Sequence, residues 1–257
     1  WMSMVAFTFQ IYFDFSGYAD MAVGAGRMFG LRLPFNFSSP YRAGSITEFW
    51  RRWHMTLSRF LRDYLYIPLG GNKHGKLRQN VNLLFTMLLG GLWHGAGWNF
   101  VIWGGLHGVA LVVHHAWASR RKVHAEAATA AGRVAGWFLT MLVVVAGWAL
   151  FRATTTDGAL AMLGGMAGLT GAGGMPLAPV EDVATAWSLI VAGLALAWLF
   201  PNSQQLLDRE PIGGSEALPH VRVRLSMSGW TAAGYGAMLF ACLASMSDVS
   251  EFLYFQF

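Results

Sequence analysis

The chain has 257 residues, of which 55% are hydrophobic and 12% are charged, and its mean hydropathy is +0.42. Soluble domains average about 25% charged residues, so this composition excludes an ordinary soluble domain. Several apolar stretches approach the roughly 20 residues that a helix needs to cross a membrane. The net charge of +5 comes from short basic clusters, and no continuous basic stripe points to nucleic acid. We therefore expect an all-α, polytopic integral membrane protein.

Residues 1–33 predict one or two membrane segments. The chain begins within apolar sequence and shows neither the basic region nor the cleavage site of a signal peptide. We expect a single membrane-embedded domain over residues 1–257 that lacks upstream transmembrane helices. Asp14 and Asp20 would lie about 240° apart on one helix, and Gly17 between them is a candidate helix break. These carboxylates could be held by neighbouring helices or could line a polar cavity.

Residues 34–44 predict a loop, because two prolines and a glycine interrupt any regular pattern. A capping box, Ser-x-x-Glu at 45–48, then predicts the start of an amphipathic helix over 46–66. Its aromatic and leucine residues form one stripe, and its arginines occupy much of the opposite surface, which suits a membrane interface. His54 falls on the apolar side, four residues after Trp50. It could be a packed core residue or a chemical group.

The stretch Leu89–Trp98 places His94 in an apolar run among four glycines and two tryptophans. An ionisable side chain in such a run indicates a functional site. Glycines allow other backbone or a ligand to come close to it. His94 is therefore the first candidate for chemistry.

Basic clusters at 70–80 and 120–122 flank two apolar stretches, 81–93 and 100–117. Both clusters should face the cytoplasm, which requires an even number of crossings between them. A two-armed hairpin or re-entrant element with His94 near its tip satisfies this condition. A single bent span is the alternative.

The rest of the chain contains further apolar stretches. Candidate spans are 134–151, 184–200 and 230–247, and a short half-helix is expected at 159–169. The polar residues 201–228 should lie inside, and the aromatic tail 247–257 should be interfacial. The single cysteine, Cys242, is expected to be a small buried hydrophobic residue.

Few groups in the chain can support catalysis. There is no Gly-x-Ser-x-Gly elbow, phosphate-binding loop or dinucleotide fingerprint. His107, His114 and His115 follow His94, but no His-x-x-x-His pair has a carboxylate nearby, so no metal is expected. The remaining possibility is a histidine that acts as a general base, because a neutral imidazole in a water-excluding site can take a proton from a hydroxyl.

Four motifs carry a resemblance to a known family. They are Gln10–Gly24, Ser45–Ser58 with its Trp-Arg-Arg-Trp-His sequence, Leu61–Asn72, and Asn82–Asn99 with Leu-Trp-His-Gly. In this order they resemble the membrane-bound O-acyltransferase (MBOAT) family, in particular its alginate O-acetyltransferase branch, which is related to the teichoic-acid D-alanyltransferases.

The resemblance implies a catalytic role for His94, which matches the family's active-site histidine, and for His54, which matches its second position. It implies a helical bundle with broken or re-entrant helices and interfacial amphipathic helices. The activity implied is transfer of an acetyl group from a cytoplasmic thioester, acetyl-CoA or another acyl thioester, towards hydroxyls of a secreted polysaccharide such as alginate. Periplasmic acetyltransferase proteins are the implied partners, in the bacterial inner membrane, with no bound cofactor.

Further residues are expected to bind substrate or line a cavity beside the two histidines: Trp93, Trp98, Trp50, Asp14, Asp20 and Asn99. Two other readings stay open. One is D-alanyl or other acyl transfer to a cell-envelope polymer. The other is a membrane transporter of an acyl group or a small polar substrate, because broken helices and midplane histidines occur in transporters too.

Overall fold

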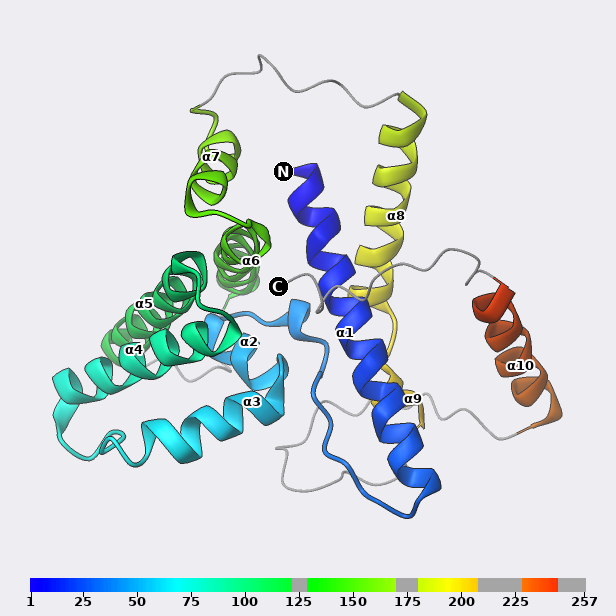
Figure 1. Cartoon of the computed structure of the whole chain (residues 1–257), viewed down its shortest axis with the longest axis horizontal. Helices are drawn as coiled ribbons and strands as arrows, with labels where there is room; N and C mark the ends of the chain where they lie inside the picture. Colours follow the sequence, from blue (N-terminus) through cyan, green and yellow to red (C-terminus); the bar gives the residue numbers. More distant parts are fainter. Residues whose placement is uncertain (122–128, 170–179, 208–227, 245–257) are drawn as a thin grey trace.

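A computed structural model of the chain describes residues 1–121, 129–169, 180–207 and 228–244 (Figure 1). Within these ranges every regular element is helical, which confirms the all-α prediction. The elements are α1 (Met2–Met28), η1 (Pro40–Arg42), α2 (Ile46–Arg52), α3 (Met55–Phe60), the π-helical η2 (Leu61–Tyr66), α4 (Gly75–His94), α5 (Trp98–Arg121), α6 (Ala130–Arg152), α7 (Thr156–Met166), α8 (Val180–Leu199), α9 (Ser203–Leu207) and α10 (Gly229–Ala244).

Two helices in the described part of the chain are long and apolar enough to cross a membrane, namely Trp98–Arg120 in α5 and Ala130–Arg152 in α6. The apolar parts of α8 and α10 are shorter. The predicted half-helix corresponds to α7. Most of the polar segment 201–228 and the whole tail 247–257 lie outside the described residues.

The first helix, α1, is continuous over 27 residues, so the break suggested at Gly17 was wrong. A glycine inside a helix costs only about 0.5–1 kcal/mol, and burial of residues such as Phe7 and Ile11 along α1 offsets that loss. Because the helix is unbroken, Asp14 and Asp20 lie on different sides of it. Asp14 is exposed, whereas Asp20 is partly buried.

Helices α4 and α5 form the predicted two-armed hairpin, joined through Gly95–Gly97 (Figure 1). The helices approach closely at glycines: a Cβ on Gly91 would lie 2.2 Å from the Phe100 carbonyl oxygen, and one on Gly104 would lie 2.2 Å from the Met87 carbonyl oxygen. This pairing rules out the single bent span. The first arm begins at Gly75, so the second half of the predicted basic turn is helical.

The amphipathic helix predicted over 46–66 is interrupted. Trp53 is extended and His54 has a left-handed backbone with φ of 42°, so α2 and α3 are separate helices. The cause is the preceding loop. The Ser38 N–H donates to the Arg52 carbonyl and the Met55 N–H donates to the Asn36 carbonyl, both at 2.9 Å, in place of helical hydrogen bonds.

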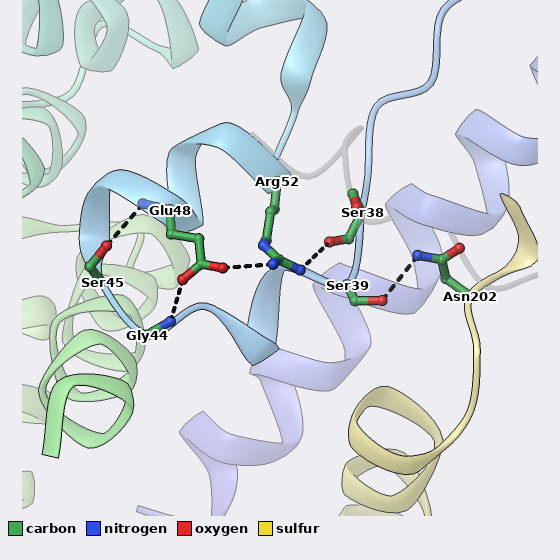
Figure 2. A network of polar contacts seen from close by, with 7 residues as sticks. All are labelled: Ser38, Ser39, Gly44, Ser45, Glu48, Arg52 and Asn202. Atoms are coloured by element: carbon green, nitrogen blue, oxygen red, sulfur yellow. Dashed lines mark hydrogen bonds and ion pairs between the residues drawn. The ribbon is translucent and has the colours of Figure 1, made fainter. Parts of the chain in front are cut away.

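A polar network holds this loop against α2, and it comprises Ser38, Ser39, Gly44, Ser45, Glu48, Arg52 and Asn202 (Figure 2). The predicted capping box is present at its start, because the Ser45 hydroxyl accepts from the Glu48 N–H at 3.2 Å. The Glu48 carboxylate pairs with Arg52 at 2.6 Å, and Arg52 donates to the Ser38 carbonyl at 3.3 Å. Asn202 donates to the Ser39 hydroxyl at 3.0 Å, so the loop is tied to the segment after α8.

Aromatic side chains dominate the core between α1, α2, α5 and α6, with Trp53, Phe49 and Trp148 buried at its centre. Helix α10 lies apart from this core and buries none of its residues (Figure 1). Cys242 on α10 is exposed, so its predicted burial was wrong. The apolar residues of a helix such as α10 become buried only where another surface packs against them.

Candidate active site

His94 is the last residue of α4, at the tip of the hairpin. Its ring stands edge-on against Trp103 of α5, with 5.2 Å between centroids, and against Phe151 of α6, also at 5.2 Å. Trp93 packs on it at 5.0 Å. Three aromatic rings from three helices therefore fix the orientation of the imidazole, which stays partly exposed.

The turn after His94 depends on glycine for packing. A Cβ on Gly95 would lie 2.6 Å from the Phe100 ring, which fills the space beneath the turn. Phe100 in turn contacts Phe151 at 5.3 Å. The glycines around His94 thus allow the hairpin and α6 to close on one another, which sets the position of the catalytic candidate.

His54 sits in the corner between α2 and α3, outside the two candidate spans. Its ring packs edge-on against Phe15 at 4.9 Å. Burial lowers the pKa of His54, so the neutral imidazole is favoured. The Thr56 hydroxyl donates to Asn36 Oδ1 at 2.5 Å and lies 3.5 Å from His54 Nδ1.

The structure brings His54 and His94 into one region. A proton on His54 would disfavour a proton on His94. Trp53, the residue before His54, also begins a row of aromatic rings that reaches His94: it contacts Trp148 at 5.0 Å, Trp148 contacts Phe151 at 5.7 Å, and Phe151 contacts His94. The two histidines predicted for catalysis are therefore near enough for a charge on one to influence the other.

The other predicted site residues have different surroundings. Trp50 is buried against Trp103 at 5.8 Å, whereas Trp93 and Trp98 at the hairpin tip are 61% and 73% exposed. The Asn99 amide donates to the Ala153 carbonyl at 2.8 Å and so secures the end of α6. Contact of these residues with a substrate stays a prediction.

Asp20 lines a cavity of about 310 Å³ between α1, the loop at 37–39 and the α8–α9 connection. Its carboxylate accepts from the Ser203 hydroxyl at 2.5 Å. Phe37 forms part of the cavity wall and contacts Phe15 at 5.0 Å, and Phe15 contacts His54. The cavity is thus separated from His54 by aromatic rings, and Asp14 is not among its lining residues.

The aromatic walls of the site, Trp103, Trp148 and Phe151, were not predicted from the sequence. His107 was considered there only as a possible metal ligand. Within the described ranges no group of three His, Cys, Asp or Glu residues is arranged to hold a metal ion. The spacing of Trp103 and His107, four residues apart on one helix, was a signal that both lie on one face.

The two histidines lie among apolar helices, and comparison with known sequences identifies the class of protein. The membrane-bound O-acyltransferase family model matches residues 1–151, which is more than half of the chain. The chain belongs to this family.

Individual relatives agree with this assignment. A peptidoglycan O-acetyltransferase of Helicobacter pylori is 51% identical over 172 residues, covering 66% of this chain and 32% of the relative. A protein named "Probable alginate O-acetylase AlgI" from Pseudomonas putida is 40% identical over all of this chain and 53% of its own length. A teichoic acid D-alanyltransferase of Streptococcus thermophilus is 32% identical over 60% of this chain. The chain thus spans about a third to a half of the curated relatives it matches.

Proposed function

We propose that this chain is part of a multi-pass enzyme of the bacterial inner membrane that transfers an acetyl group to a cell-envelope polysaccharide. The donor is a cytoplasmic thioester, acetyl-CoA or another acyl thioester, and the acceptor is a hydroxyl of a secreted polymer such as alginate. The observation that supports this most directly is the position of His94, which is held by aromatic rings at a hairpin tip in the same region as His54.

In the proposed reaction His94 is the general base. Its lone pair takes the proton of the acceptor hydroxyl while the oxygen attacks the thioester carbonyl. The carbon–sulfur bond then breaks, and the leaving thiolate takes the proton back from the imidazolium. A positioned base of this kind supplies about 10²–10⁴-fold in rate.

His54 is proposed as the partner of His94. It would orient the acyl carbonyl or stabilise the charge that develops on its oxygen. The aromatic rings on two sides of His94 would limit the access of water, the competing nucleophile that would hydrolyse the thioester. Trp93, Trp98, Trp50, Asp14, Asp20 and Asn99 are the proposed substrate-binding or cavity residues.

The hairpin supports transfer across the membrane. Its arms have 20 and 24 residues, so His94 lies roughly 30 Å along the helices from the basic residues at their other ends. If those basic residues face the cytoplasm, His94 lies deep enough to meet an acceptor that arrives from the outer side. Periplasmic acetyltransferase proteins would then pass the acyl group onward.

A near alternative is D-alanyl or other acyl transfer, which the similarity to a teichoic acid D-alanyltransferase supports. The difference lies in the acyl group, and the same base chemistry applies to both. Comparing labelled acetyl and labelled D-alanyl donors would distinguish them. A transporter would instead accumulate labelled substrate across the bilayer with no covalent transfer.

The test uses membranes that contain the full-length protein and a radiolabelled acyl thioester. His94→Ala should lower polymer acetylation by about 10²-fold or more. His54→Ala should lower it as well, and His114→Ala is the matched control, because His114 contacts Thr47 on α2 rather than the site. Normal acetylation by well-folded His94→Ala protein would exclude His94 as the base.

A further inference from the structure

His107 is a completely buried histidine on α5 that the proposed reaction does not use. Neither of its ring nitrogens has a hydrogen-bond partner. Two neighbouring indoles share this property, since the Nε1 atoms of Trp50 and Trp103 are also buried and unpartnered. Buried polar groups in proteins are nearly always paired, so three unpaired groups together need a physical explanation.

The cage around His107 is aromatic on several sides. Its ring lies 4.9 Å from Trp103, 5.3 Å from Trp50 and 6.3 Å from Phe49, measured between centroids. The helix α6 closes it at Gly147, where a Cβ would lie only 2.7 Å from His107 Nε2. A phenyl ring is planar like imidazole but one ring atom larger, so at this position it would keep an aromatic ring in the cage and remove both imidazole nitrogens. An apolar cage gives no reason for a polar imidazole, because an unpaired buried polar group costs free energy.

Trp103 connects this cage to the catalytic candidate. One part of the indole packs on His107, and the same side chain carries the edge-on contact with His94 at 5.2 Å and 89°. Phe151, the second wall of His94, also contacts Trp103 at 5.5 Å. A change in the orientation of the Trp103 ring would therefore alter the contact that it makes with His94.

One hydrogen bond is possible among these unpaired groups. Neutral imidazole offers one acceptor nitrogen, and each indole offers one N–H donor. A hydrogen bond between the Trp103 N–H and His107 would need only a small movement of rings that are already in contact. Such a bond would be strong in a dry surrounding. It would also select one orientation of Trp103.

We infer that His107 is a positioning residue for the proposed acyl transfer, which acts through Trp103 to hold His94 in its reactive orientation. The inference rests on the proposed function for its effect on turnover, but the contact of both His107 and His94 with Trp103 is a property of the structure. A small displacement of a catalytic group costs about 10²-fold in rate. A phenyl ring at 107 would keep an aromatic contact with Trp103 and remove the acceptor for the indole N–H.

The test compares His107→Phe, His107→Gln and the control His115→Phe in the full-length protein. His115 lies on the same helix and also has a buried, unpartnered nitrogen, but it contacts Thr47 rather than Trp103. We expect His107→Phe to remain folded and to lose about ten- to a hundredfold in kcat, with KM for the donor unchanged. His107→Gln, which keeps a polar group, should recover part of the rate. His115→Phe should match the wild type.

A second measurement does not depend on acyl transfer. The rate at which diethyl pyrocarbonate modifies His94, followed by peptide mass spectrometry, should change several-fold in His107→Phe and stay the same in His115→Phe. If the wild type transfers no acyl group, the proposed function fails. The reactivity of His94 towards diethyl pyrocarbonate then tests by itself whether His107 positions His94. Two results would overturn it: wild-type kcat and His94 reactivity in His107→Phe, or a rate in His107→Gln no higher than that in His107→Phe although both variants fold.

Discussion

Ser39 and His54 both hold a left-handed backbone conformation, with φ of 47° and 42°. Ser39 directly follows the segment 36–38, and His54 lies within the segment 52–55 that hydrogen-bonds to it. In the described part of the chain they are the two non-glycine residues with positive φ. Such a conformation costs on the order of 1–3 kcal/mol and persists only where the surrounding contacts enforce it. Here the enforcing contacts are the backbone pairs that join residues 36–38 to residues 52–55. The strain is thus located at the second histidine of the proposed site.

Substitutions at His54 can separate its effect on folding from its effect on acyl transfer. Asparagine tolerates the left-handed region, so His54→Asn should fold with a stability near that of wild type and lose most acyl transfer. His54→Val, with a branched Cβ, should lose a further 1–3 kcal/mol or so of unfolding free energy. Thermal unfolding in detergent and acetyl transfer in membranes would measure the two effects. Wild-type transfer by His54→Asn would remove His54 from the mechanism.

Stability should depend on pH through His54. Burial lowers the pKa of this imidazole in the folded protein, whereas the unfolded chain titrates near 6.5. Below about pH 6.5 the unfolded state therefore binds more protons, and the free energy of unfolding should fall as the pH decreases. Above that pH the contribution of His54 is constant. Melting temperatures between pH 8 and pH 5 should decline less steeply in His54→Asn, and identical slopes would contradict this account.

The hairpin should be sensitive to one glycine and tolerant at another. In Gly91→Ala the new Cβ would meet backbone at 2.2 Å, so we expect a loss of about 1–3 kcal/mol or more in unfolding free energy. Gly105→Ala is the matched control on the partner helix. Its nearest contact would be a leucine methyl at 3.4 Å, and the helix preference of alanine should add about 0.5–1 kcal/mol. Unfolding midpoints of the two variants would test the close approach of α4 and α5. If the approach is as described, the midpoint should fall in Gly91→Ala and rise in Gly105→Ala.

The two carboxylates of α1 should behave differently. Asp20→Ala removes the acceptor of the Ser203 hydroxyl, and a hydrogen bond to a charged group contributes about 1.5–3 kcal/mol. Asp14→Ala, at an exposed position, should change stability by less than about 0.5 kcal/mol. Adding Ser203→Ala to Asp20→Ala should cost little more, because the contact is already lost. Additive losses in that double-mutant cycle would show that the two side chains do not interact.

Much of the architecture could be read from local sequence patterns. The capping box at Ser45 predicted the start of α2, and the basic clusters on either side of His94 predicted the α4–α5 hairpin. Motif order identified the family through His54 and His94. These features depend on residues within a turn or two of one another, or on composition, and both are visible along the chain.

Features that depend on distant residues could not be predicted in this way. The break at His54 arises from pairing with Asn36, whose carbonyl competes for the Met55 N–H. The Asp20–Ser203 hydrogen bond joins residues from opposite ends of the described chain. Trp103 became the link between His94 and His107 only because α4, α5 and α6 pack closely at glycines. Helical periodicity encodes which face of a helix is apolar, but which partner covers that face is decided by the packing of the whole bundle.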